Sequence, residues 1–289
     1  MPHRPCLSAM WLVLAACGSG GGDGGRADAA SAPGEDGSRA DAARDPCAFP
    51  SGATTGARVH VVYLVPADRE EVPAYTANLA QAIRQLQVWY GDQTGGDTFE
   101  VNAPVVEVLS TSHAADFYAT HDAGGDAYLR FWDNTLADAF PLTGGGFNDP
   151  EHIWLYYIDA DNGCNQIGGG GTSGVAVLPA NDLRGLTDEP RIRDCPDEQP
   201  DTQPRCRWVG GLGHELGHAF GLGHPPACED ASPDTVCPDD ALLWTGYTVF
   251  PDAHLTSADL DVLAASPFFA PRPALPTCAL DCAPTVTPE

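Results

Sequence analysis

Three histidines and one glutamate in a short run of the sequence have the spacing of a metal-binding group. The run contains His214, Glu215, His218 and His224, with Gly221 before the last histidine. On a helix, His214 and His218 project from one face, and Glu215 lies beside them. Gly221 can adopt a positive φ without steric cost, so we expect it to end the helix and let His224 reach the same metal from a loop.

This set of side chains predicts a catalytic zinc site. Three imidazole ligands leave one coordination position for water, whose pKa zinc lowers to about 7. Glu215 can accept a proton from that water as it attacks a carbonyl group, and can return the proton to the leaving amine. Packing alone can also produce a helix rich in His, Gly and Leu, but it does not explain four matched side chains at this spacing. We therefore predict a metallopeptidase.

The whole run resembles the signature of the metzincin clan of zinc endopeptidases, His-Glu-x-x-His-x-x-Gly-x-x-His, and matches it in full. The resemblance implies Zn²⁺ as the cofactor and a protein or peptide as the substrate. It also implies an α/β (α+β) fold with a twisted mixed sheet, an active-site helix and a small C-terminal lobe below the zinc cleft. The motif is specific to the clan rather than to one of its families.

Members of the clan also carry a methionine in a tight turn beneath the metal, and this chain departs from that pattern. Both of its methionines lie within the first ten residues. We expect residues 241–247 to form the turn, with Leu243 or Trp244 as its hydrophobic floor, because Leu is close to Met in volume. Tyr247 is a candidate for lining a substrate pocket, and packing in the core is the competing explanation.

The N-terminal segment predicts export. Residues 1–16 contain Arg4 and an apolar stretch too short to span a bilayer, as in a signal peptide. Residues 14–17 resemble the lipobox of bacterial lipoproteins, which implies acylation of Cys17 and anchoring on the extracytoplasmic side of a membrane. An ordinary signal peptide, cleaved nearby to give a secreted protein, is the alternative. Residues 17–46 are rich in Gly, Ala and Asp and predict a flexible tether.

The remaining sequence predicts one metallopeptidase domain over residues 47–282, followed by a short tail over residues 283–289. We divide the domain into an upper lobe (47–224) and a lower lobe (225–282). Hydrophobic periodicity predicts strands at 58–65, 98–109 and 151–158, and helices at 71–90, 126–140 and 257–265.

A short strand is also predicted at residues 175–178, and in the clan it would form the sheet edge above the metal helix. An extended peptide can add to such an edge by backbone hydrogen bonds. The four glycines before this strand, residues 168–171, are explained equally well as a flexible connection.

The charge of the chain excludes some partners. Its formal net charge is -26, and all 14 basic residues are arginines, so we do not expect it to bind nucleic acid. Residues 159–163 resemble a calcium loop, which would hold a structural Ca²⁺. A solvated turn is the preferred interpretation, because the bidentate glutamate of a calcium-binding EF-hand is missing.

Eight cysteines follow the predicted signal and lipobox segments, and an even number in an exported chain indicates disulfides. Sequence alone does not fix their pairing. Short loops favour Cys195–Cys206, Cys228–Cys237 and Cys278–Cys282, which leaves Cys47–Cys164. A second zinc site is the rival interpretation, but the chain lacks paired Cys-x-x-Cys motifs.

Two other functions stay open. The domain could bind peptides as a catalytically silent, metzincin-like lipoprotein, although the presence of Glu215 argues against a lost activity. It could also be a zinc amidase that acts on a cell-wall component.

Overall fold

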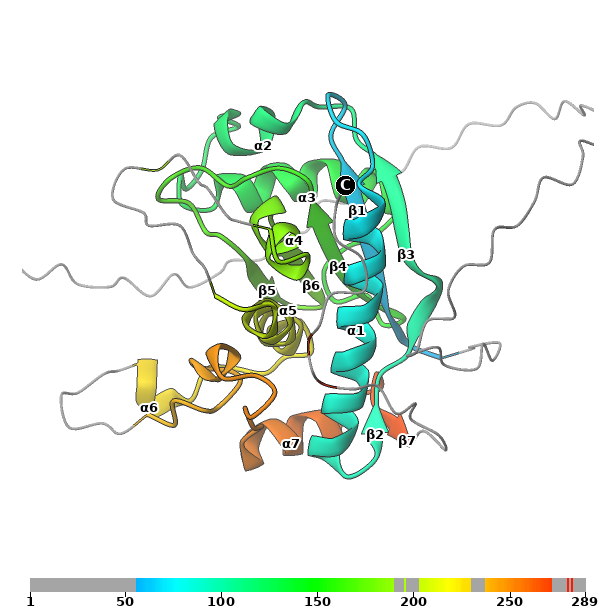
Figure 1. Cartoon of the computed structure of the whole chain (residues 1–289), viewed down its shortest axis with the longest axis vertical. Coiled ribbons are helices and arrows are strands. Elements are labelled where there is room, and N and C mark those ends of the chain that lie inside the picture. The colour runs from blue at the N-terminus through cyan, green and yellow to red at the C-terminus, as the bar shows by residue number, and fades with distance from the viewer. Residues whose placement is uncertain are drawn as a thin grey trace, which may run out of the picture. The chain divides into compact units, whose positions relative to one another are not determined.

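The computed structural model describes residues 56–189, 195, 203–229, 237–271, 280 and 282, all within one compact unit spanning residues 43–289. Its centre is a five-stranded sheet with the order β3-β1-β4-β6-β5 (Figure 1). The parallel strands are β1 (Arg58–Val65), β3 (Val101–Ser110), β4 (His152–Ile158) and β6 (Val175–Leu178). Strand β5 (Gly170–Thr172) pairs antiparallel with β6. The predicted α/β class with a mixed sheet is confirmed.

Helices cover both faces of this sheet, which explains why its strands are almost continuously apolar. Strand β1 places Val59, Val61 and Tyr63 in one core and Val62 and Leu64 in the other. The first core also contains α1 (Pro73–Thr94), α4 (Ala180–Leu186) and α5 (Arg205–Ala219). The second contains α2 (Ala115–Thr120) and α3 (Arg130–Thr143). The sheet therefore supports α5 from one side.

The chain after α5 forms short elements that pack below this helix (Figure 1). They are α6 (Pro226–Glu229), the 3₁₀ helix η1 (Gly246–Thr248), α7 (Ser257–Ala264) and β7 (Ala270–Pro271), which pairs with β2 (Asp97–Thr98). Thr256 caps α7 by accepting a hydrogen bond from the backbone N–H of Asp259, and the Asp259 side chain accepts one in return. The predicted C-terminal helix is confirmed.

Several predicted boundaries move, and the short helices α2, α4, α6 and η1 were not predicted. Strand 58–65 is confirmed, and the helix predicted at 71–90 runs from Pro73 to Thr94. The strand predicted at 98–109 is divided into β2 and β3, and the helix predicted at 126–140 begins and ends a few residues later. Helices α2 and α4 have 6 and 7 residues, too few for a clear helical period.

The strand predicted at residues 175–178 is confirmed, but its predicted place at the edge of the sheet is wrong. Strand β6 (Val175–Leu178) pairs with β4 on one side and β5 on the other, so the edge belongs to β5. The glycines before β6 are therefore not a plain flexible connection, because Gly170 and Gly171 form most of the edge strand. Because glycine has no side chain, β5 shows no hydrophobic alternation, and a prediction based on that alternation could not detect it.

The disulfides correct most of the predicted pairing. Cys228–Cys237 is confirmed. Cys164 pairs with Cys195 and Cys206 pairs with Cys282, so the predicted Cys195–Cys206, Cys278–Cys282 and Cys47–Cys164 pairs are wrong. Cys47 and Cys278 lie outside the described residues. The prediction relied on short sequence separation, whereas the fold brings the start of α5 next to the C-terminal segment.

Cys206–Cys282 joins residues 76 apart, whereas Cys228–Cys237 joins residues 9 apart. Because a longer closed loop restricts the unfolded chain more, replacing both Cys206 and Cys282 by Ser should lower the free energy of unfolding by about 2–4 kcal/mol. Urea unfolding under non-reducing conditions measures this loss. The matched Cys228→Ser/Cys237→Ser protein should lose less, and an equal or larger loss there would contradict the loop-length argument.

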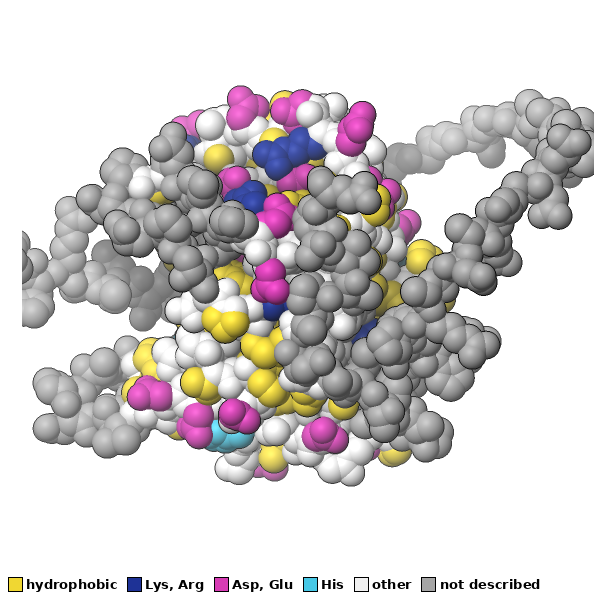
Figure 2. Space-filling view, in the orientation of Figure 1, with side chains coloured by type: hydrophobic (Ala, Val, Ile, Leu, Met, Phe, Trp, Pro, Cys, Tyr) yellow, Lys and Arg dark blue, Asp and Glu magenta, His cyan; other side chains and the backbone are white. Residues whose placement is uncertain are grey.

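Acidic side chains lie at the upper and lower ends of the face drawn in Figure 2. The solvated turn predicted at residues 159–163 is wrong for Asp159, which is buried and forms an ion pair with Arg69. Asp161 pairs with Arg184. These two carboxylates therefore face arginines rather than a shared calcium position. In the described part of the chain, no helix combines the length and apolarity that crossing a membrane requires.

Candidate metal centre

Helix α5 carries the motif. One side of this helix is apolar and packs into the core, and the other side is polar. Leu212, Leu216 and Ala219 are buried in the core at near-helical spacing. The helix ends at Ala219, and Gly221 follows with a φ of +94°. The backbone N–H of Leu222 then donates to the carbonyl of Gly217 at 3.0 Å, which closes the last turn. The predicted helix end is confirmed.

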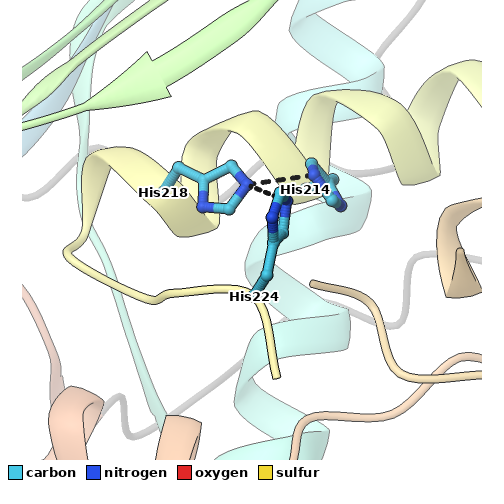
Figure 3. A group of neighbouring side chains, drawn as sticks. All are labelled: His214, His218 and His224. Atoms are coloured by element: carbon cyan, nitrogen blue, oxygen red, sulfur yellow. Dashed lines mark hydrogen bonds between the residues drawn. The ribbon is translucent and has the colours of Figure 1, made fainter. Parts of the chain in front are cut away.

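The turn at Gly221 brings three imidazoles together (Figure 3). Nε2 of His218 lies 3.0 Å from Nε2 of His214 and 3.0 Å from Nε2 of His224. One ring nitrogen from each residue lies within 4.8 Å of the others, and among the described residues this is the group able to hold a metal ion. A tetrahedral ion with nitrogen ligands at about 2.1 Å holds those nitrogens roughly 3.4 Å apart. The three rings fit such an ion with only small shifts.

The other ring nitrogen of two histidines is already held by the backbone. Nδ1 of His214 lies 2.7 Å from the carbonyl oxygen of Leu242, and Nδ1 of His218 lies 2.9 Å from that of Leu222. A carbonyl only accepts, so each Nδ1 carries the proton. When both rings are neutral, their Nε2 lone pairs face each other and repel. A cation shared by the two nitrogens removes this repulsion, because each lone pair then coordinates the cation. The donor set therefore fits a zinc ion.

Burial keeps the first histidine uncharged. Desolvation lowers the pKa of His214 to about 3, and the neighbouring His218 ring contributes to the lowering. A neutral imidazole is the form that binds a metal, so His214 needs no deprotonation at neutral pH.

Glu215 follows His214 in the sequence, and its side chain lies next to Gly169 of the glycine run at residues 168–171. Its Oε1 is 3.7 Å from the position that a Cβ atom on Gly169 would occupy. Burial raises the pKa of Glu215 to about 8; the nearby carboxylate of Asp182 adds to the rise, and Arg207 opposes it. A cation held by the neighbouring histidines would act in the opposite direction and favour the ionised carboxylate, which is the form that can accept a proton.

The edge strand β5 lies directly against α5. A Cβ atom on Gly171 would stand 2.0 Å from the backbone oxygen of Glu215 and 3.0 Å from Cβ of His218. Only glycine permits this approach, so the strand edge passes next to the histidines. The sequence run of four glycines was the available signal for this contact.

The predicted floor turn lies beneath the histidines, and both floor candidates take part in it. Leu243 is fully buried, with its methyl groups 3.1 and 3.2 Å from the position of a Cβ on Gly217 in α5. Trp244 is half-buried, with its ring 5.7 Å from that of His224. Tyr247 places its ring edge-on to His214 at 5.3 Å. Leu242, whose carbonyl holds His214, was missed, because a backbone acceptor leaves no signal in the sequence.

Because Leu243 packs under α5, Leu243→Met should preserve the packing. We expect the free energy of unfolding to change by less than about 1.5 kcal/mol, with zinc content unchanged. Leu243→Ala is the matched control and should cost about 2–5 kcal/mol, because it leaves a cavity. Urea unfolding of both proteins measures the difference, and a severe loss in the Met variant would show that another residue forms the floor.

A scan against protein-family models gives no match, and a search of curated proteins finds no similar sequence. Some solved structures resemble this one. OgpA from Akkermansia muciniphila, solved in a catalytically inactive form with an O-glycopeptide substrate, is 20% identical with a TM-score of 0.49; the alignment covers 80% of this chain and 65% of OgpA. This chain thus spans less than two thirds of that relative.

Two further solved structures are less similar. Archaemetzincin from Methanopyrus kandleri is 16% identical with a TM-score of 0.39, over 73% of this chain and 97% of its own. Metalloproteinase-II from Bacteroides fragilis is 13% identical with a TM-score of 0.35, and the alignment covers 73% of this chain and 53% of that protein. Because all three TM-scores are below 0.5, the function of this protein is inferred from its own residues.

Proposed function

We propose that this protein is a zinc-dependent endopeptidase of the metzincin type, with His214, His218 and His224 as the metal ligands and Glu215 as the catalytic base. The observation that carries the proposal is the convergence of the three imidazoles, two of them locked by backbone carbonyls with Nε2 turned toward the others. Three ligands on one side leave the other side of the ion open for chemistry. When bound there, zinc supplies Lewis acidity, which polarises a carbonyl group and lowers the pKa of water.

The side chains of the protein supply the rest of the reaction. Glu215 takes a proton from the water that attacks the scissile carbonyl and passes it to the nitrogen of the leaving amine. Burial raises the pKa of Glu215 to about 8 without a metal, and a Zn²⁺ ion held by the histidines would favour the ionised carboxylate, which is the form that accepts this proton. Leu242 and Leu222 fix the orientation of the His214 and His218 rings through their carbonyl oxygens.

The substrate is a protein or peptide that adds to strand β5. Among the described strands it is the edge of the sheet, paired on one side with β6. An extended peptide that forms backbone hydrogen bonds with β5 lies next to Glu215, because Gly171 contacts the backbone of that residue. Tyr247 lies edge-on to His214 and Trp244 lies beside His224, where the two rings can line the pocket of a substrate side chain.

The protein acts outside the cytoplasm, anchored through Cys17 or secreted after ordinary signal cleavage. Residues 1–55, which include the signal peptide, Cys17 and the tether of residues 17–46, lie outside the described residues. Support comes from the sequence of this segment and from the three disulfides, which persist in oxidising compartments.

Metal content together with peptide cleavage tests the proposal. The protein, purified without its signal peptide, should contain one zinc per chain and cleave members of a quenched-peptide library. Chelation should abolish the cleavage, and zinc should restore it. Zinc without cleavage of any peptide would turn the proposal toward a silent binding protein or an amidase; a cell-wall amide substrate separates these two. Absence of zinc would overturn it.

A further inference from the structure

Arg207 extends along α5 toward the histidines. It lies seven residues before His214, which places the two residues on the same face of the helix. Its Nη1 atom is 2.9 Å from the position that a Cβ on Gly211 would occupy. The guanidinium therefore lies over the bare backbone of Gly211, roughly 5 Å along the helix axis from His214. Any larger residue at position 211 would displace it.

Two aromatic rings fix the guanidinium in this position. The Cζ atom of Arg207 is 3.8 Å from the ring centre of Trp208 and 4.9 Å from that of Tyr247. The Tyr247 ring also contacts His214 edge-on at 5.3 Å. These stacking contacts hold the plane of the guanidinium while leaving its N–H groups able to bind a planar anion. The cation is therefore preorganised beside the metal ligands.

Within the described residues, Arg207 differs in its partners from three other arginines of this acidic protein. Arg69, Arg130 and Arg184 each form an ion pair with an aspartate. Among the residues that the structure describes, none places a carboxylate within ion-pair distance of Arg207, which is only half-buried. An acidic group does lie near the same glycine: Oδ1 of Asp182 is 4.0 Å from the Cβ position of Gly211.

We propose that Arg207 binds a carboxylate of the substrate, so that the enzyme prefers an acidic residue beside the scissile bond. The inference rests on the proposed peptidase function. A carboxylate is planar and bidentate and matches the guanidinium fork. Tyr247 forms the wall between this subsite and His214, so a side chain bound to Arg207 belongs to a residue adjacent to the reacting carbonyl. A free C-terminal carboxylate offers the same chemistry, and the experiment separates the two sources.

The competing explanation is that Arg207 only offsets the negative charge of Asp182 and Glu215. In that case its removal would weaken binding of all peptides to the same extent. A recognition role instead affects acidic peptides selectively, and this difference provides the test.

Direct binding of paired peptides tests the inference without depending on turnover. The zinc-loaded Glu215→Gln protein is titrated with peptides that differ only as Glu or Gln on either side of the cleavage position, each with a free or an amidated C-terminus. The same titrations are repeated after adding Arg207→Gln, Arg207→Lys or Arg207→Glu. Arg130→Gln is the control, because it removes an equal charge from α3, where Arg130 pairs with Asp122.

We expect the Glu peptide to bind at least about tenfold more tightly than the Gln peptide. Arg207→Gln should abolish this preference, Arg207→Lys should keep part of it, Arg207→Glu should reverse it in favour of the Gln peptide, and Arg130→Gln should leave it unchanged. A preference that follows the free C-terminus would assign the carboxylate to the chain end. Equal binding of all peptides, an equal loss for all in Arg207→Gln, or no binding would overturn the inference; zinc-dependent cleavage of neutral peptides would still support the peptidase function.

Discussion

Glu215→Gln should lose peptide hydrolysis by a factor of about 10²–10⁴ while retaining its zinc. Glutamine has nearly the same shape as glutamate, but it cannot accept a proton from the attacking water. The three imidazoles that we assign to the metal do not include this residue, so their geometry should persist. The rate is measured with a quenched peptide, and zinc is measured by elemental analysis of the same sample.

A ligand variant provides the contrast to this result. His218→Ala removes the ring that lies 3.0 Å from both of the others, so this protein should lose zinc and activity together. If Glu215→Gln keeps its activity, the proposed base is wrong. If it loses zinc as well as activity, Glu215 holds the metal site together rather than moving a proton.

Gly171→Ala should damage both stability and activity, although the substitution adds only one methyl group. The new Cβ would stand 2.0 Å from the backbone oxygen of Glu215, so strand β5 or helix α5 must move. Overpacking of this kind costs about 1–3 kcal/mol of folding free energy. A displacement of about 1 Å near reacting groups lowers the rate about 10²-fold, and β5 is the strand to which we expect the substrate to add.

Gly169→Ala is the matched control within the same glycine run. The nearest atom to its new Cβ would be Oε1 of Glu215 at 3.7 Å, which is an ordinary contact. Its stability should stay the same or rise by up to about 1 kcal/mol, because alanine restricts the unfolded chain. Thermal or urea unfolding and peptide cleavage measure both proteins. Equal stability of the two variants would contradict the tight contact between β5 and α5.

The residues that we propose as metal ligands were predictable because their relation is local. A helix fixes the positions of residues four apart, so His214 and His218 share a face wherever α5 lies. Gly221 has a positive φ, as its place in the sequence predicted, and the turn returns His224 to the same point. The buried strands β1 and β4 were equally clear, because apolar runs of that length bounded by polar residues predict strands.

The contacts around that site were not predictable, because they join segments that are distant in sequence. The carbonyl of Leu242 holds His214 across 28 residues, and no side-chain pattern marks a backbone acceptor. Short separation predicted only one disulfide correctly, because the fold pairs Cys206 with Cys282 across 76 residues. The edge strand was assigned to β6, because the glycines of β5 carry no hydrophobic signal.

The sequence by itself therefore determined the α/β class, the helix that bears the histidines and the chemistry that their spacing favours. These follow from backbone geometry and hydrophobic periodicity, which operate within a few residues. Only the tertiary structure decided which strand forms the sheet edge, which carbonyls orient the rings and which cation faces the site. Arg207 reaches toward His214 because Gly211 leaves space and Trp208 and Tyr247 hold the guanidinium, and packing between distant segments creates that arrangement.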